Sequence, residues 1–251
     1  MDEDDRIKAE RLGIRRTALE SMLENIREVS CLVLQGGAAL QFEFGTGRHT
    51  KGVDFVVSGC FDNLFPYLIG ITKPLHVGER EIGSSGSRAH RKGNNIPGFI
   101  ITTYKVGGEY LELRIFEGES CEPFVSNRYP PLKVENPNEI YSRKMAIILK
   151  QASKDKPLPR NHLFDLDPLT LNWGATTDLK RIKEYAKIQG TPNIVTPEVF
   201  RQVVKYLQNP VNQTRIRHKL QDSLLPKYLE ANKMDFDYFR AISFNHFEMI
   251  F

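Results

Sequence analysis

The chain has 251 residues, of which 40% are hydrophobic and 26% charged, and its formal net charge at pH 7 is +4. These values describe an ordinary soluble protein with room for one large domain or two modest ones; no hydrophobic run is long enough to cross a membrane, and the acidic start MDEDDR is unlike a secretory signal. Three widely spaced cysteines, Cys31, Cys60 and Cys121, lack metal-site spacing and are expected to be reduced thiols of an intracellular, cytoplasmic protein.

The N-terminal part begins with helical periodicity and continues as short strands. Residues 5–27 place apolar side chains on one side of a helix. The run CLVL (31–34) predicts a strand that stops at Gly36 and Gly37, and AALQFEF (38–44) suits a brief helix. The run VDFVV (53–57) predicts the second strand.

Three more strands are expected at LHVGEREI (75–82), GFIITTYKV (98–106) and EYLELRIFE (109–117). The last two pair through a turn at Gly107 and Gly108. The stretch from Gly83 to Gly98 is rich in Gly, Ser and basic residues, which predicts a mobile hairpin tip or loop. A disordered surface loop is favoured there over a flap that closes on a substrate.

From residue 136 onward the pattern is helical. Asn136 and Pro137 open a helix over 138–152, and Thr196, Pro197 and Glu198 open another. The net charge is −2 over residues 1–135 and +6 over residues 136–251. A basic second half either holds a polyanion, such as tRNA or a nucleoside triphosphate, or consists of solvated helix faces. The sequence thus predicts an α+β fold, with a mixed sheet in domain 1–135 and an all-helical domain 136–251.

Two acidic residues point to phosphate chemistry. Alternation along a strand places Asp54 and Gly52 on one face of their strand, and Glu112 and Arg114 on one face of theirs. If the strands are neighbours, Asp54 and Glu112 converge, and converging carboxylates bind Mg²⁺ or Mn²⁺. Glycines between a strand and a helix, such as Gly36 and Gly37, let the backbone approach a phosphate.

The stretch LQGGAALQFEFGTGRHTKGVDFVV (34–57) resembles nucleotidyltransferases of the AbiEii type, which are toxins of abortive-infection and related toxin–antitoxin systems. They belong to the DNA polymerase beta-like superfamily. The resemblance covers residues 31–167 and implies a nucleotidyltransferase-like sheet. The matching positions are Gly36, Gly37, Arg48, Thr50, Asp54, Glu112, Lys144 (in YSRKMAIIL) and Asp165 (in NHLFDL).

The resemblance implies transfer of a nucleotidyl group from a nucleoside triphosphate (NTP) to a hydroxyl of RNA, such as tRNA, or of a protein. In this scheme Asp54 and Glu112 bind Mg²⁺ or Mn²⁺, and Asp165 positions the acceptor or acts as general base. The nucleotide is held by Gly36, Gly37, Arg48, Thr50 and Lys144. A cognate antitoxin is an expected partner.

Three departures from the family pattern fall on important positions. Gly52 stands where the family has its first metal-binding Asp, Ala38 replaces a hydroxyl residue, and His162 replaces an Asp. The alternative is therefore a catalytically inactive, nucleotide-binding or regulatory descendant of the fold. Some of these residues also have purely structural explanations. Lys144 is then a solvated cation on a helix, and Asp165 and Asp167 lie at a helix end near Pro168. Trp173 is expected to be a buried structural residue.

Overall fold

The computed structural model describes residues 3–57, 61–70, 75–77, 80–82, 84–90, 98–106, 108–118, 122–221, 236–248 and 250. The chain divides into two compact units, Met1–Asn136 and Pro137–Phe251. The first unit contains the sheets and the second is helical, which confirms the predicted α+β fold class. Cys60 and Cys121 lie outside the described residues, whereas Cys31 is a free thiol whose pKa is raised by burial.

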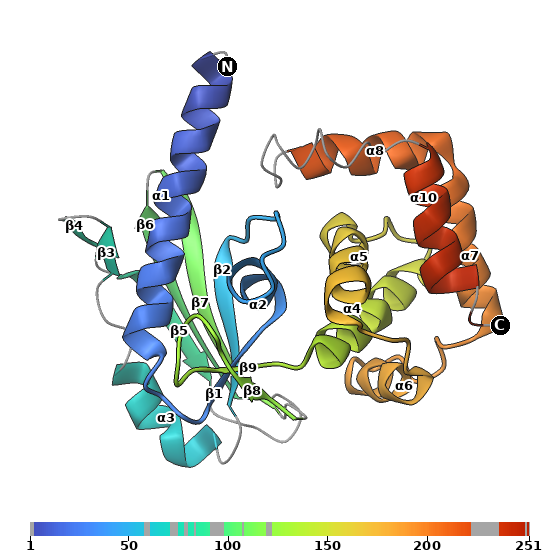
Figure 1. Ribbon diagram of the computed structural model, residues 1–251. Helices are drawn as coiled ribbons and strands as arrows, with labels where there is room; N and C mark the ends of the chain where they lie inside the picture. Colours follow the sequence, from blue (N-terminus) through green and yellow to red (C-terminus); the bar gives the residue numbers. More distant parts are fainter. Residues whose placement is uncertain are drawn as a thin grey trace. The chain divides into compact units, whose positions relative to one another are not determined.

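The first unit is built on a mixed seven-stranded sheet with the order β5-β6-β7-β2-β1-β9-β8 (Figure 1). The pairs β1–β9 and β2–β7 are parallel, and the remaining pairs are antiparallel. The strands are β1 (Leu32–Gln35), β2 (Gly52–Val57), β5 (Ser84–His90), β6 (Phe99–Val106), β7 (Glu109–Glu117), β8 (Phe124–Val125) and β9 (Lys133–Val134).

Three helices accompany the sheet: α1 (Glu3–Ile26), α2 (Gly36–Phe42) and α3 (Phe61–Gly70). The long helix α1 packs against β2, β6 and β7, and its buried apolar residues follow the periodicity that predicted it. Helix α2 follows β1 directly and packs against β1 and β2. This arrangement leaves the connection between β1 and α2 next to the start of β2.

Alternation along the two central parallel strands supplies the core. Val53, Phe55 and Val57 on β2 are fully buried, as the sequence predicted. Their counterparts on β7, Leu111, Leu113 and Ile115, are also buried. Between these core residues, Asp54 on β2 and Glu112 and Arg114 on β7 are partly exposed, whereas Val56 on β2 is buried as well.

Glu43, just after α2, is a buried acid that fixes a loop of the first unit. Its carboxylate accepts hydrogen bonds from Ser126 Oγ (2.6 Å) and from the backbone N–H of Asn127 (2.9 Å). The same Ser126 oxygen accepts from the backbone N–H of Tyr129 (2.9 Å). A buried carboxylate with this many donors is satisfied, so it ties the segment before β9 to the end of α2.

The secondary structure predicted for two segments of the first unit was wrong. Residues 84–90, expected in a loop, form the exposed strand β5, because pairing with β6 satisfies a backbone that its Gly- and Ser-rich sequence does not favour. Residues 91–97, the rest of that expected loop, lie outside the described residues. The single strand expected at 75–82 is a separate hairpin of β3 (Leu75–Val77) and β4 (Arg80–Ile82).

The second unit is organised around the buried helix α4, which contacts α5, α6 and α7. Helix α7 in turn contacts α8, α10 and a terminal π-helical turn η1. The helices are α4 (Pro137–Ala152), α5 (Arg160–Trp173), α6 (Leu179–Ile188), α7 (Pro197–Gln208), α8 (Pro210–Gln221), α10 (Phe236–Ser243) and η1 (Phe244–Glu248).

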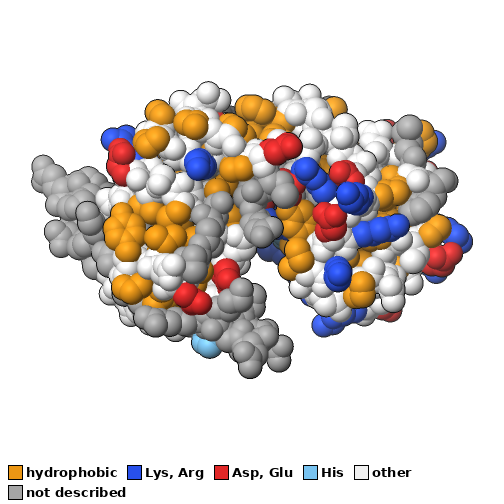
Figure 2. Space-filling view, turned by 90° about the horizontal axis from the view of Figure 1, so that it is seen from below, with side chains coloured by type: hydrophobic (Ala, Val, Ile, Leu, Met, Phe, Trp, Pro, Cys, Tyr) orange, Lys and Arg blue, Asp and Glu red, His pale blue; other side chains and the backbone are white. Residues whose placement is uncertain are grey.

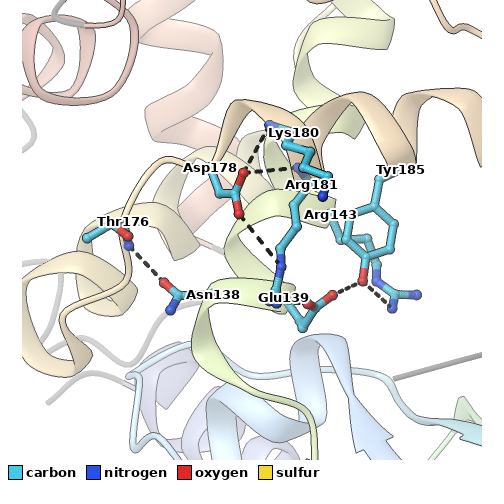
Figure 3. A network of polar contacts seen from close by, with 8 residues as sticks. All are labelled: Asn138, Glu139, Arg143, Thr176, Asp178, Lys180, Arg181 and Tyr185. Carbon is cyan, nitrogen blue, oxygen red and sulfur yellow. Dashed lines mark hydrogen bonds and ion pairs between the residues drawn. The ribbon is translucent and has the colours of Figure 1, made fainter. Parts of the chain in front are cut away.

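A polar network fixes α4 against α6, with Glu139 at its centre (Figure 3). This carboxylate is 1% exposed and contacts the Arg181 guanidinium and the Tyr185 hydroxyl. The Arg143 guanidinium lies 4.7 Å from the centre of the Tyr185 ring, a cation–π distance. Asp178 caps α6 by accepting from its first backbone N–H groups. These contacts join residues of α4 to residues of α6 and so hold the two helices together.

The helical predictions have mixed outcomes. Thr196 caps α7 by accepting from the Val199 N–H, and Pro197 follows at the first position, as predicted. Pro168 lies inside α5, so Asp165 and Asp167 are not at a helix end. Trp173, expected to be buried, is 40% exposed because α5 ends there at Gly174, whose positive φ terminates the helix.

The helical unit carries many charged side chains on its surface. Figure 2 shows Lys and Arg side chains there, interspersed with Asp and Glu. The exposed face of α6 contributes Lys180, Lys183 and Lys187. Within the part of the chain that is described, no helix has both the length and the apolar character that crossing a membrane requires.

Candidate active site

The turn between β1 and α2 brings a glycine against the Asp54 carboxylate. Gly36 has a φ of +66°, a left-handed conformation that side-chain-bearing residues rarely adopt. A Cβ atom added to Gly36 would lie 3.5 Å from Asp54 Oδ2. The backbone of this turn therefore lies directly beside the only acidic side chain of β2.

The second glycine of the turn contacts the segment that precedes β2. A Cβ atom on Gly37 would lie 2.7 Å from Arg48 Nη2 and 3.0 Å from Thr50 Oγ1, so both side chains lie closely against this glycine. Thr50 is held by two hydrogen bonds: its N–H donates to Gln41 Oε1 on α2 (2.8 Å), and its hydroxyl donates to the Gly52 carbonyl (3.2 Å). These contacts hold the glycine turn, the buried Arg48 and the start of β2 together as one site.

Strand register places the two predicted carboxylates on one face of the sheet. The strands β2 and β7 are parallel neighbours, with Gly52 opposite Glu112 and Asp54 opposite Arg114. Paired residues of neighbouring strands point to the same face, so Asp54, Glu112 and Arg114 share one face. The arrangement adds a cation to the two acids that the sequence singled out.

The Arg114 guanidinium occupies the space between the acids. Its Nε lies 2.7 Å from Asp54 Oδ1, and its Nη2 donates a hydrogen bond to Asp54 Oδ2 (3.3 Å). The distance from Nε to Glu112 Oε2 is 3.8 Å. The side chains of Asp54, Arg114 and Glu112 are 19%, 34% and 38% exposed, so solvent reaches all three.

Gly52, where the resemblance implies the family's first metal-binding Asp, has little room for a side chain. A Cβ atom there would lie 2.7 Å from the Glu112 carbonyl oxygen and 3.3 Å from Arg114 Nη2. The first neighbour is backbone and cannot rotate away. The second neighbour is Arg114 Nη2, so the guanidinium lies next to the position that a Cβ atom of residue 52 would take.

These residues do not fit the divalent-metal site that the resemblance implies. A Mg²⁺ or Mn²⁺ ion prefers a shell of oxygen ligands, whereas the two carboxylates here already have a cation between them. Across the described ranges, no group of three or more His, Cys, Asp or Glu side chains is arranged to hold a metal ion. The metal-binding role of Asp54 and Glu112 stays a prediction.

The other two predicted site residues lie in the helical unit and pair with each other. Lys144 Nζ on α4 donates to Asp165 Oδ2 on α5 at 2.6 Å. The side chains are 5% and 0% exposed, so the reading of Lys144 as a solvated cation is wrong. Their roles in phosphate binding and proton transfer stay predictions. His162, also singled out, lies in the first turn of α5.

His49, between Arg48 and Thr50, is an uncharged neighbour of the site at neutral pH. Burial lowers its pKa to about 4, and the positive charges of Arg15 and Arg16 add to the shift. Neither ring nitrogen has a hydrogen-bond partner among the described residues. The His49 ring is therefore a neutral side chain close to the positive charges of Arg15 and Arg16 on α1.

Sequence reasoning missed two side chains of this face. Arg114 had been placed on the right face, but only the parallel register sets it opposite Asp54. Gln35, the last residue of β1, is opposite Asp54 on the other side and is 8% exposed. Its Oε1 is a buried acceptor without a partner among the described residues. No local sequence pattern sets either residue opposite Asp54, because that depends on the pairing of strands distant in the chain.

The sequence model of a family described as "Nucleotidyl transferase AbiEii toxin, Type IV TA system" matches residues 17–242. No curated protein matches the sequence. Among solved structures, JHP933 from Helicobacter pylori is 14% identical, with a TM-score of 0.47, over 94% of this chain and 88% of that chain. The nucleotidyltransferase toxin MenT4 from Mycobacterium tuberculosis is 14% identical, with a TM-score of 0.44, over 80% and 71%.

Proposed function

The chain belongs to the AbiEii nucleotidyltransferase toxin family, and from this premise we propose that it transfers a nucleotidyl group from an NTP to an acceptor hydroxyl. One observation carries the proposal: the glycine turn lies against Asp54, with Arg48 and Thr50 packed on its other glycine. A glycine backbone beside a guanidinium is suited to a phosphate chain, because backbone N–H groups and the positive charge both favour anions.

The proposed reaction is an in-line displacement at the α-phosphorus. The acceptor oxygen forms a bond to that phosphorus while the bond to the oxygen bridging to the β-phosphate breaks, and pyrophosphate leaves. The acceptor's proton passes to Glu112, the more exposed of the two carboxylates on the sheet. Asp165 is less suited to that role, because it is buried and paired with Lys144.

The acceptor and the partners belong to the proposal as well. The acceptor is an RNA, such as tRNA, or a protein, and the basic helical half supports an RNA. A type IV toxin–antitoxin family supports a cognate antitoxin as a further partner.

Label transfer tests the proposal. The purified chain is incubated with each NTP carrying a label on the α-phosphate, together with total RNA or a protein extract. We expect label in an acceptor with the wild type and a loss of about a hundredfold with Asp54→Asn. The matched control is Glu109→Gln, which removes another Arg-paired carboxylate of the same unit, the partner of Arg15. Equal transfer by wild type and Asp54→Asn would count against the site.

A second candidate function is nucleotide binding without transfer. The observation that favours it is Arg114, which engages Asp54 where the family places metal-bound carboxylates. In that case an NTP raises the melting temperature of the wild type, and no acceptor is labelled by any NTP. Replacing Arg48 by Gln should then reduce the thermal shift.

A further inference from the structure

We propose that the Arg114 guanidinium is the resident cation of this site, holding Asp54 and Glu112 in place of a divalent metal ion. The first support is position. Arg114 faces Asp54 directly across two parallel strands and engages both of its carboxylate oxygens, with Glu112 Oε2 at 3.8 Å. Nη2 donates the hydrogen bond, and Nε brings the positive charge within 2.7 Å of the other carboxylate oxygen, so the guanidinium neutralises Asp54.

The second support is the link between Arg114 and Gly52. The Nη2 atom lies 3.3 Å from the point where a Cβ of residue 52 would stand. An aspartate at 52 would therefore meet the guanidinium at its first side-chain atom. The glycine at position 52 thus leaves the space in which the Arg114 guanidinium lies.

The third support is charge. Two carboxylates and one guanidinium carry a single net negative charge. Three carboxylates around one divalent cation carry the same net charge. Replacing an Asp and a metal ion by Gly52 and Arg114 thus leaves the net charge of the site unchanged.

A consequence is that nucleotide binding does not require a metal ion on Asp54 and Glu112. This part rests on the proposed function, whereas the cation role of Arg114 does not. A divalent ion can enter between the carboxylates only by displacing a guanidinium that is covalently part of the chain. Removal of Arg114 should free both acids for a metal ion.

The test is a Mn²⁺ titration of the full chain without nucleotide, followed by the electron paramagnetic resonance signal of free Mn²⁺. We expect Arg114→Gln to bind Mn²⁺ about tenfold or more tightly than the wild type, because two carboxylates are released. The gain should vanish in the double variant Arg114→Gln with Asp54→Asn. Arg15→Gln, which releases Glu109 in the same way, is the control and should gain nothing.

Two results would overturn the inference. One is a wild type that already binds Mn²⁺ at a site abolished by Asp54→Asn, a measurement that needs no Arg114 variant to fold. The other is a folded Arg114→Gln whose Mn²⁺ affinity equals that of the wild type. Thermal shifts of the wild type with each NTP, in EDTA and in Mg²⁺, then separate the two proposals. Equal shifts support both, and a shift that needs Mg²⁺ overturns only the consequence that nucleotide binding needs no metal ion. If neither buffer gives a shift, the chain does not bind NTP and the proposed function is contradicted. The Mn²⁺ titration still decides the role of Arg114.

Discussion

Gly52 is a residue whose lack of a side chain has a steric cause in the parallel pair β2–β7. A Cβ atom there would lie 2.7 Å from the Glu112 carbonyl oxygen. We expect Gly52→Asp to lower the free energy of unfolding by about 1–3 kcal/mol, because an overpacked strand must shift its backbone. Urea denaturation measures the change. Gly86→Asp, on β5 with nothing within 4 Å, is the matched control and should differ little from the wild type.

Restoring the family's aspartate should therefore not restore a metal site by itself. If Gly52→Asp were as stable as the wild type, the strands would be able to move apart at this position. The steric account of the missing side chain would then be wrong. The sequence alone predicted an absent ligand here, and only the strand register shows that the space is taken.

His49 gives the protein a predicted dependence on pH. Its pKa is about 4 in the folded state and about 6.5 when unfolded, so the unfolded chain binds the proton more readily. Stability should fall as the pH drops from 6.5 towards 4, by on the order of 1 kcal/mol after allowance for solvent screening of a half-buried ring. His49→Gln should flatten this part of the profile in urea denaturations at each pH. An unchanged slope in the variant would assign the pH dependence to other groups.

At the scale of elements, α4 and α5 are joined by the buried pair Lys144–Asp165. Asp165→Asn leaves an ammonium group without its counter-charge in a site that solvent does not reach. We expect a loss of about 3–5 kcal/mol in the free energy of unfolding. The double variant Lys144→Met with Asp165→Leu should recover most of it, since no charge stays buried.

The exposed pair Arg201–Glu198 on α7 is the control, and Arg201→Gln should leave the stability unchanged. A single variant as stable as the control would show that the pair is not buried in solution. If the folded double variant Lys144→Met with Asp165→Leu binds NTP as tightly as the wild type does, the pair is structural and Lys144 is not a phosphate ligand.

Elements with strong local signals could be predicted from the sequence. β7 begins and ends as predicted, because Leu111, Leu113 and Ile115 alternate cleanly. α7 was predictable from its cap at Thr196. β5 was not, because residues 84–90 have the composition of a loop and become a strand only by pairing with β6. Register across distant strands, which sets Arg114 opposite Asp54, is likewise not encoded in any local pattern.

At the scale of the whole molecule, the charge asymmetry offers a test of the acceptor class. The helical half carries a net charge of +6, with Lys180, Lys183 and Lys187 exposed on α6. If the acceptor is RNA, binding should weaken steeply with salt, and each of these lysines that contacts a phosphate should contribute about 1 to the slope of log K against log salt. Filter binding of RNA at several salt concentrations measures the slope.

Replacing the three lysines by Gln should lower both the affinity and the slope, whereas Arg16→Gln on the exposed side of α1 is the control. An affinity that does not change with salt would favour a protein acceptor. The sequence supplied the charge imbalance itself, but it could not say which lysines are exposed, because that depends on which face of α6 packs against α4.

The order of strands also bears on how the chain is made. β1 lies between β2 and β9 in the sheet, although about a hundred residues separate it from β9 along the chain. During synthesis one edge of β1 thus stays without its neighbour until Lys133 and Val134 have emerged from the ribosome. A nascent chain halted before that point exposes an unpaired apolar strand, which makes translation pauses in this stretch a hazard for aggregation.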